Sequence, residues 1–164
     1  MGKRIKIRAR TIEVIAELNN TRTAQAIWEA LPIKGIVRLW GDEIYFSIPL
    51  ILRPESAKEV VNVGDLGYWP EGNAFCIFFG LTPASKGGQI KPASAVNVFG
   101  KIIGDATMLK KVNAGAKITI EQDKEERQEP QNIALLIQEQ NTRSRQLIQL
   151  PQDNNKTIQI INRT

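Results

Sequence analysis

Apolar and polar positions alternate through residues 3–18 in two consecutive segments. Basic side chains alternate with apolar ones in residues 3–10, and apolar side chains alternate with Glu13 and Glu17 in residues 11–18. This period of two is typical of half-buried strands. We therefore predict an antiparallel hairpin in which the basic face meets the two glutamates, and each opposite-charge pair contributes up to about 1 kcal/mol.

The period changes to that of a helix between Asn20 and Leu31. Asn20 or Thr21 can accept the first free backbone N–H groups, and Pro32 ends the pattern. One apolar stripe runs along the predicted helix. It consists of Ala24, Ile27, Trp28 and Leu31. We interpret Trp28 as a plug over one end of a barrel.

Further strands are predicted at residues 33–39, 44–48 and 117–121, with a short turn and strand within residues 55–63. Gly41-Asp42 lies between the first two of these strands. A two-residue connection with glycine first is typical of a type II′ hairpin turn.

Residues 64–105 hold most of the aromatic side chains and many of the glycines. Residues 74–79 are apolar at every position, which favours a strand that is buried on both sides or that lines a closed barrel. A later strand at residues 96–103 is interrupted by Gly100. Glycine within a strand often marks a bulge or a barrel corner.

A boundary is predicted near Asp123, where a charged stretch begins that ends in Pro130. We expect a barrel domain in residues 1–123 and a C-terminal extension in residues 124–164. The extension retains apolar segments, so we expect it to pack on the barrel and to add a strand around Thr157–Ile161.

Composition is that of a globular protein, with 164 residues of which 42% are hydrophobic and 24% charged. We see neither an apolar run of membrane-spanning length nor a signal peptide, so no membrane partner is expected. The single cysteine, Cys76, lies in a strongly apolar strand, which favours a buried, reduced thiol. We therefore expect a cytoplasmic protein. A homodimer remains open.

The net charge of +5 and the pI of about 9.5 permit a weak attraction to nucleic acid. The basic strand at residues 3–10 is better interpreted as a partly neutralised strand surface, so nucleic-acid binding stays a distant alternative. The chain contains no histidine, which removes the commonest general base and metal ligand. We predict no catalytic residues, no metal and no cofactor.

Two stretches carry a resemblance to a known fold. Residues 98–102, Val-Phe-Gly-Lys-Ile, resemble the Val-Phe-Gly-Lys-Val strand of cyclophilins, and residues 18–31 resemble their strand, loop and first helix. Residues 64–80, with the run Tyr-Trp-Pro-Glu-Gly-Asn, and residues 92–101 resemble a family of small, uncharacterised bacterial and archaeal cyclophilin-like barrel proteins. The resemblance covers roughly residues 3–121. It implies a mainly β fold, a closed eight-stranded antiparallel barrel with one or two capping helices.

The resemblance also implies where cyclophilin activity would be located. Cyclophilins isomerise prolyl peptide bonds with an arginine beside a pocket that a histidine borders. The histidine position falls on Val96, and the strand at residues 43–48 offers Glu43 and Tyr45 in place of the arginine. We therefore predict a noncatalytic module that binds a small molecule or a peptide. A prolyl isomerase with altered residues is the alternative, with Arg38 and Arg53 as weak substitutes.

The predicted ligand-binding residues are mostly aromatic side chains of the central stretch, because an apolar concave site with few polar groups is the usual binding pattern. They are Tyr45, Tyr68, Trp69, Glu71, Phe75, Phe79 and Phe99. Tyr68 and Trp69 are the stronger candidates, since each combines an apolar ring with a polar group. Under the alternative interpretation the phenylalanines fill the barrel and Glu71 is a solvated loop carboxylate.

Overall fold

The alternation of residues 3–18 produces the predicted hairpin in the computed structural model, which describes residues 2–124. Strands β1 (Arg4–Ala9) and β2 (Ile12–Leu18) pair antiparallel, with Arg4 opposite Glu17 and Arg8 opposite Glu13. Arg8 Nε lies 3.2 Å from a carboxylate oxygen of Glu13, and Lys6 Nζ lies 3.9 Å from the other. The predicted hairpin and its charge pairing are confirmed, and the basic face is partly neutralised.

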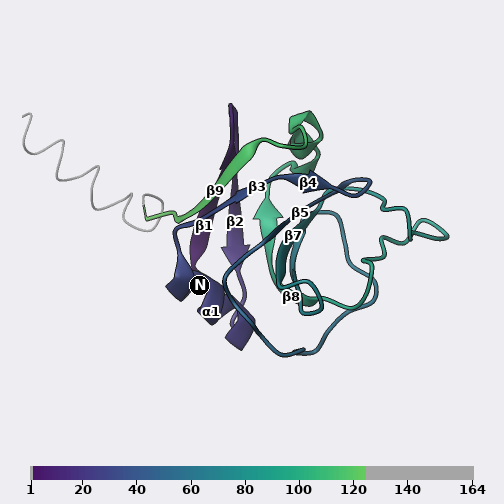
Figure 1. Cartoon of the computed structure of the whole chain (residues 1–164), viewed down its shortest axis with the longest axis horizontal. Helices are drawn as coiled ribbons and strands as arrows, with labels where there is room; N and C mark the ends of the chain where they lie inside the picture. Colours follow the sequence, from purple (N-terminus) through teal and green to yellow (C-terminus); the bar gives the residue numbers. More distant parts are fainter. Residues whose placement is uncertain (1, 125–164) are drawn as a thin grey trace, which may run out of the picture. The chain divides into compact units, whose positions relative to one another are not determined.

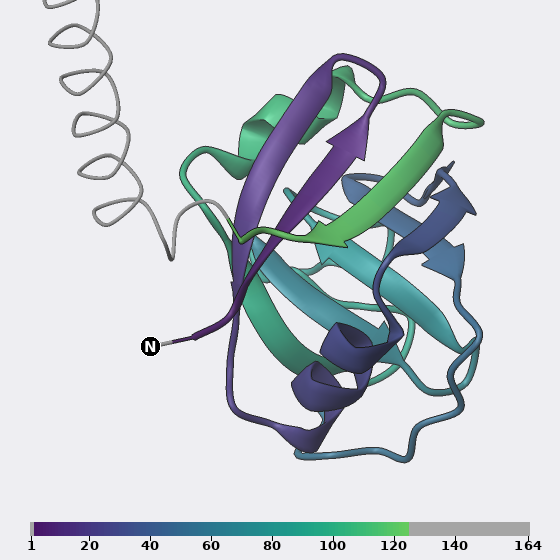
Figure 2. The same ribbon diagram turned by 90° about the vertical axis from the view of Figure 1, so that its left-hand side faces the viewer.

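In residues 2–124 two short helices lie at opposite ends of the barrel (Figure 2). Helix α1 (Arg22–Ala30) begins at Thr21, whose side-chain oxygen accepts a 3.0 Å hydrogen bond from the backbone N–H of Ala24. Its apolar stripe faces the barrel interior, where Ile27 is fully buried. At the other end the 3₁₀ helix η1 (Ala106–Lys111) buries Leu109. The predicted helix and its cap are confirmed.

Seven more strands complete one antiparallel sheet (Figure 1). They are β3 (Ile33–Ile36), β4 (Arg38–Leu39), β5 (Glu43–Ser47), β6 (Asp65–Trp69), β7 (Ala74–Phe78), β8 (Asn97–Ile103) and β9 (Lys117–Gln122). The strand order is β3-β9-β1-β2-β8-β6-β7-β5-β4. Among the described residues the fold is therefore mainly β, as predicted.

The two edge strands of this sheet, β3 and β4, are separated in sequence by Val37 alone. Residues 33–39, predicted as one strand, therefore form two, of which β3 pairs with β9 and β4 pairs with β5. Between them Val37 donates its N–H to the Ala116 carbonyl at 2.8 Å. The described residues therefore form a nearly closed barrel of nine strands, close to the eight-stranded barrel expected. The number is higher by one because the predicted strand at residues 33–39 forms both β3 and β4, which pair with different neighbours.

The turn after β4 has the predicted length. The Trp40 N–H donates to the Glu43 carbonyl at 2.9 Å across Gly41-Asp42, and Gly41 has a φ of 60°. Residues 55–63 do not form a regular strand. They contribute two isolated bridges, from Lys58 to Val96 and from Val61 to Ile90.

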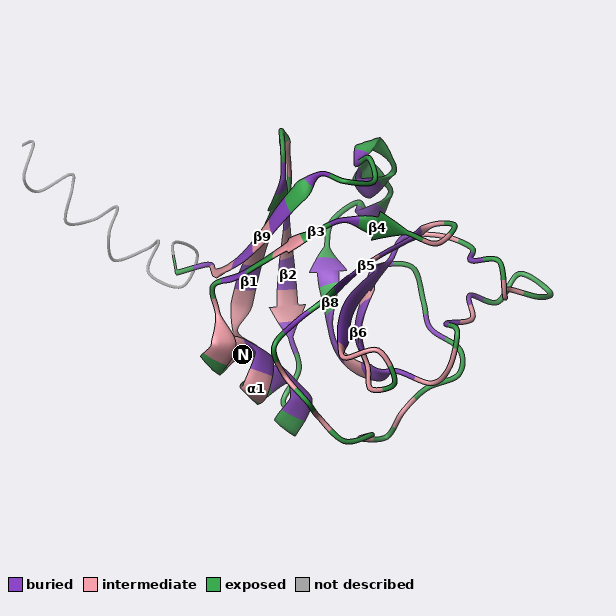
Figure 3. Ribbon diagram, viewed as in Figure 1, coloured by how far each residue is buried: buried purple, intermediate pink, exposed green. Residues whose placement is uncertain are grey.

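Strand β7 is buried at all five positions, and its ribbon is continuously purple where it can be seen in Figure 3. Phe75 and Ile77 point into the barrel interior and belong to the main core. The alternate residues point outward into a second apolar cluster. That cluster consists of Val61, Ala74, Cys76, Phe78, Ile90 and Val96. The outer face of the sheet is therefore covered by the bridge-forming segments.

The glycine of β8 marks a bulge, as predicted. Leu66 pairs with Gly100 but the next residue, Gly67, pairs with Val98, so Phe99 is an extra residue on β8. A Cβ atom at Gly100 would lie 2.6 Å from the Glu17 carbonyl oxygen, which is too close for any side chain.

Residues 1–123 form one compact unit, and the chain divides after Asp123. The predicted packing of the extension on the barrel and its predicted strand around Thr157–Ile161 lie outside the described residues. Within the described part of the chain, no helix has the length and apolar character needed to cross a membrane.

Candidate functional site

The outer face of the sheet carries the side chains that do not enter the barrel. Because successive residues of a strand point to opposite faces, Tyr45, Cys76 and Gly67 form one row across β5, β7 and β6. Gly67 leaves room for Val96, since a Cβ atom at Gly67 would lie only 2.8 Å from Val96 Cγ2. The segment that contains Val96 therefore lies directly against the sheet.

A small pocket opens on this outer face, with a volume of about 220 Å³. It is lined by Trp40, Glu43, Tyr45, Trp69, Pro92, Ala93 and Val96. The turn after β4, strand β5, the end of β6 and the segment at residues 92–96 each contribute to its wall. Three aromatic rings and one carboxylate thus meet in a mostly apolar depression, which is the usual composition of a binding site.

The Trp69 side chain is held in place from two sides. Its Nε1 atom donates a 2.6 Å hydrogen bond to Ser94 Oγ. On the other side the ring packs against Gly72, where a Cβ atom would collide with it. Both contacts fix the indole in the pocket wall before any ligand arrives, which lowers the entropic cost of binding.

Glu43 is the ionisable carboxylate of this wall. The residue is only 6% exposed, and its Oε1 atom is buried without a hydrogen-bond partner among the described residues. Burial raises the pKa of Glu43 from 4.5 to about 7, and interaction with the Cys76 thiol partly lowers it. Near neutral pH the side chain therefore exists in both forms, one that donates a hydrogen bond and one that carries charge.

Cys76 lies behind Glu43 on β7 and is buried, as predicted. Burial raises the pKa of the thiol well above its usual value of 9.0, and the Glu43 carboxylate raises it further. A thiol acts as a nucleophile in its ionised form, so Cys76 is an inert, protonated neighbour of the pocket.

The structure brings two of the predicted ligand-binding residues, Tyr45 and Trp69, into the pocket. It places three others in the barrel core, because Phe75, Phe79 and Phe99 are at most 3% exposed and belong to the main apolar cluster. The ring of Phe75 stacks on Phe46 and meets Phe99 edge-on, each at 5.1 Å between centroids. These three phenylalanines therefore fill the barrel, as the alternative interpretation of the sequence expects.

Tyr68 also lies in the core, and its hydroxyl group serves a structural purpose. The hydroxyl donates to the Leu50 carbonyl at 2.7 Å and accepts from the Leu52 N–H at 3.1 Å. It also lies 3.1 Å from Asn73 Oδ1. The polar group that made Tyr68 a candidate thus anchors the irregular segment after β5. Glu71 is exposed in the turn before β7 and does not line the pocket.

Two residues of the pocket wall, Trp40 and Glu43, are not among the ligand-binding residues predicted from the sequence. A lone carboxylate after a Gly-Asp turn is typical of a solvated position, and nothing nearby indicates that residues 92–96 cover it. The predicted type II′ turn does indicate where these two side chains lie. It places Trp40 and Glu43 opposite each other, and therefore on the face that Tyr45 shares.

Two of the residues to which the cyclophilin resemblance draws attention, Val96 and Arg38, lie at or near this pocket. Val96 forms part of its wall. Arg38 is directly opposite Tyr45 in the β4–β5 pair and is exposed, so its side chain lies on the same outer face. Arg53 is exposed and contributes its backbone carbonyl to a network elsewhere.

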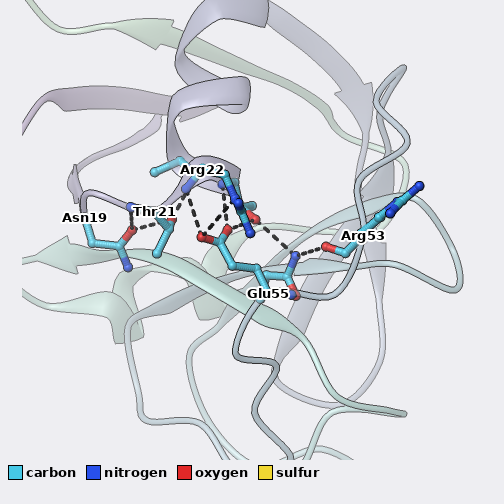
Figure 4. A network of polar contacts seen from close by, with 8 residues as sticks. Asn19, Thr21, Arg22, Arg53 and Glu55 are labelled. Atoms are coloured by element: carbon cyan, nitrogen blue, oxygen red, sulfur yellow. Dashed lines mark hydrogen bonds and ion pairs between the residues drawn. The ribbon is translucent and has the colours of Figure 1, made fainter.

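That network joins the start of α1 to the irregular segment after β5 (Figure 4). The Glu55 carboxylate accepts hydrogen bonds from the backbone N–H groups of Arg22 and Thr23, at 3.0 and 2.9 Å, and from the Thr23 hydroxyl at 2.8 Å. Asn97, which is 1% exposed, donates to Thr23 Oγ1 and to the Arg53 carbonyl. The hydrogen bonds from Thr23 and Arg22 lower the pKa of Glu55. Because its polar groups are paired with one another, we interpret this network as structural: it connects the irregular segment to helix α1.

A larger and more polar depression, of about 750 Å³, lies between β2, the start of α1 and the β6–β8 pair. Charged side chains of both signs line it, including Lys3, Glu17, Asp65 and Lys101. Burial raises the pKa of Asp65, but its carboxylate already accepts a 2.8 Å hydrogen bond from the Asn62 N–H. The aromatic pocket combines shape with an unpaired polar group, so it is the better candidate. Residues 2–124 contain no cluster of three metal-ligating side chains.

The nearly closed antiparallel barrel with a helix at each end has the architecture expected of a cyclophilin-like barrel. Residues 3–121 match the family described as Cyclophilin-like, so the chain belongs to that family. The chain is also similar to the hypothetical protein AF2241 from Archaeoglobus fulgidus, known from a solution structure. The two are 41% identical over 74% of this chain and 95% of that chain, with a TM-score of 0.65. No curated protein matches the chain. The resemblance predicted from the sequence is confirmed.

Proposed function

We propose that the barrel is a noncatalytic binding module, which holds one apolar or aromatic group of a small molecule or short peptide in the outer pocket. The observation that carries this proposal is the convergence of Trp40, Tyr45 and Trp69 on one cavity of about 220 Å³. Such a volume is below the roughly 300–1,000 Å³ typical of whole-ligand pockets. The cavity therefore suits a single side chain or head group, and the remainder of the ligand lies outside it.

Binding without catalysis fits the chemistry of the pocket wall. Stabilising a twisted prolyl amide requires a strong donor placed for the transition state. The wall residues include neither arginine nor lysine, and the chain has no histidine. A neutral tyrosine hydroxyl donates more weakly than a guanidinium group.

The experiment is a titration of the ¹⁵N-labelled full-length protein with aromatic fragments and short apolar peptides, followed by NMR. The chain has three tryptophans, and their indole N–H signals report on separate places. Trp40 and Trp69 line the pocket, whereas Trp28 packs on the main core from helix α1. We expect the first two signals to shift and the Trp28 signal to stay constant. Shifts at Trp28 alone, or at none of the three, would contradict the proposal.

The alternative, a prolyl isomerase with altered residues, is favoured by one observation. Arg38 shares the outer face with Tyr45, where it could donate to a bound peptide. A coupled assay on proline peptides separates the two functions. The binding module gives no turnover beyond the uncatalysed rate. Cyclophilin-like turnover that is lost in Arg38→Ala and retained in the matched control Arg53→Ala would establish the isomerase.

A further inference from the structure

The aromatic pocket contains a carboxylate that no described group neutralises. Trp40, Tyr45 and Trp69 supply three rings to a wall that also includes Glu43. We propose that the pocket binds a methylated ammonium group, such as a quaternary amine head group, with the three rings around it and Glu43 as its counter-ion. This inference rests on the proposed function, because it names the chemical class of the group that enters the same pocket.

The charge of the pocket wall favours a cationic ligand. No ion pair between described residues includes Glu43, and its buried Oε1 atom makes no hydrogen bond with them. The Cys76 thiol is the neighbour that interacts with the carboxylate, and a thiol is too weak a donor to balance a buried negative charge. A buried carboxylate with one unpaired oxygen and no cationic partner is unfavourable in its charged form, and a cation that enters the pocket would lower that cost. A neutral apolar ligand would leave it in place.

The aromatic rings of the pocket wall also favour a cationic ligand. Tryptophan and tyrosine attract cations through the negative faces of their rings, and clusters of such rings recognise quaternary ammonium groups. The rest of the wall, Pro92, Ala93 and Val96, is apolar and offers nothing to solvate a strongly hydrated primary ammonium. Methyl groups on the nitrogen match this wall, and the cavity of about 220 Å³ limits the ligand to a head group.

The groups around Glu43 also set how binding depends on pH. Cys76 on β7 faces it and stays protonated, and Tyr45 lies two residues along the same strand. Arg38 on β4 lies opposite Tyr45 on the same outer face, is exposed and forms no ion pair with Glu43. The segment at residues 92–96 contributes no titratable side chain. Since the pKa of Glu43 is about 7, the counter-ion forms as the pH rises through neutrality, and cation affinity rises with it.

The test compares choline with 3,3-dimethyl-1-butanol, which has the same shape with carbon in place of the charged nitrogen. Each is titrated into the ¹⁵N-labelled full-length protein at pH 8, and the indole signals of Trp40 and Trp69 give the Kd. We expect choline to bind about tenfold more tightly than the alcohol. Because Glu43 is mostly neutral at pH 6, choline affinity should increase about tenfold from pH 6 to pH 8, while that of the alcohol should not rise.

Glu43→Gln keeps the side-chain shape and removes the charge. It should weaken choline binding about tenfold and affect alcohol binding much less. The matched control Glu29→Gln removes the same charge from an exposed position on α1 and should change neither. An unchanged ¹⁵N spectrum outside the pocket verifies that each variant is folded.

Equal affinity for the two probes would overturn the cation proposal while supporting the proposed function. Choline affinity that survives Glu43→Gln would also overturn it. If neither probe binds, the cation proposal fails, and the titration with fragments and peptides still decides the proposed function, because those probes contain no quaternary ammonium group.

Discussion

Glu43 is the residue whose environment most affects how the stability of the protein depends on pH. Its pKa in the folded protein, about 7, lies above the ordinary value of 4.5, because burial disfavours the charged form. The folded state therefore binds the proton more tightly than the unfolded state. Stability is highest below pH 4.5 for this group and falls as the pH rises toward 7.

Glu43→Gln should remove the decrease in stability that ionisation of Glu43 causes as the pH rises. The change from 4.5 to about 7 corresponds to at most about 3 kcal/mol, and residual solvent contact reduces it. We expect the variant to be more stable than the wild type at pH 8 and to differ little from it at pH 4.5. Urea denaturation at both pH values measures the difference. Parallel pH profiles for wild type and variant would show that Glu43 is not buried as described.

At the scale of elements, helix α1 depends on a carboxylate from outside the helix. Thr21 supplies the local cap, and Glu55 accepts two further N–H groups of the first turn. A negative charge at a helix N-terminus is also favoured by the helix dipole. The irregular segment after β5 and the helix are therefore stabilised together.

Glu55→Ala should lower the free energy of unfolding by about 1 kcal/mol, the usual cost of a lost N-cap. Because hydrogen bonds lower the pKa of Glu55, its contribution is present above the ordinary carboxyl pKa and is lost as the pH falls through the folded value. Urea denaturation at pH 7 measures the change, and amide exchange should accelerate at Arg22 and Thr23. The exposed neighbour Glu59 provides the control, since Glu59→Ala should leave both unchanged.

For the molecule as a whole, the barrel carries its own core. The buried residues of the main cluster run from Ile5 to Ile120, and the strands from Arg4 to Gln122. Residues 1–123 also form a separate compact unit. We therefore expect the barrel to fold without residues 124–164.

A protein truncated after Asp123 should therefore unfold cooperatively, with the NMR dispersion of a folded barrel. If the extension packs on the barrel, as its apolar segments predict, the truncated form should also melt at a lower temperature than the full chain. An identical melting temperature would contradict that packing. Loss of the folded spectrum would instead show that the barrel depends on the extension.

The sequence predicts those parts of the fold where only one face of an element is apolar. Alternation determined the register of β1 and β2, and the stripe of α1 identified its buried side. At residues 74–79 both faces are apolar, so the pattern could not tell the barrel interior from the outer face. The pattern is therefore compatible with Phe75 in a pocket, whereas the structure places it in the core. The covering segment at residues 92–96 depends on contacts distant in sequence, which periodicity does not report.

The position of β9 has a consequence for the synthesis of the protein. Strand β9 is hydrogen-bonded on one side to β1 and on the other to β3, both of which precede it by tens of residues and are made earlier. At about 5–20 residues per second, the nascent chain waits several seconds with those two strand edges open. Open edges invite pairing with neighbouring polypeptides. The growing chain is therefore most prone to aggregate before Gln122 leaves the ribosome, and insertion of β9 ends that vulnerable interval.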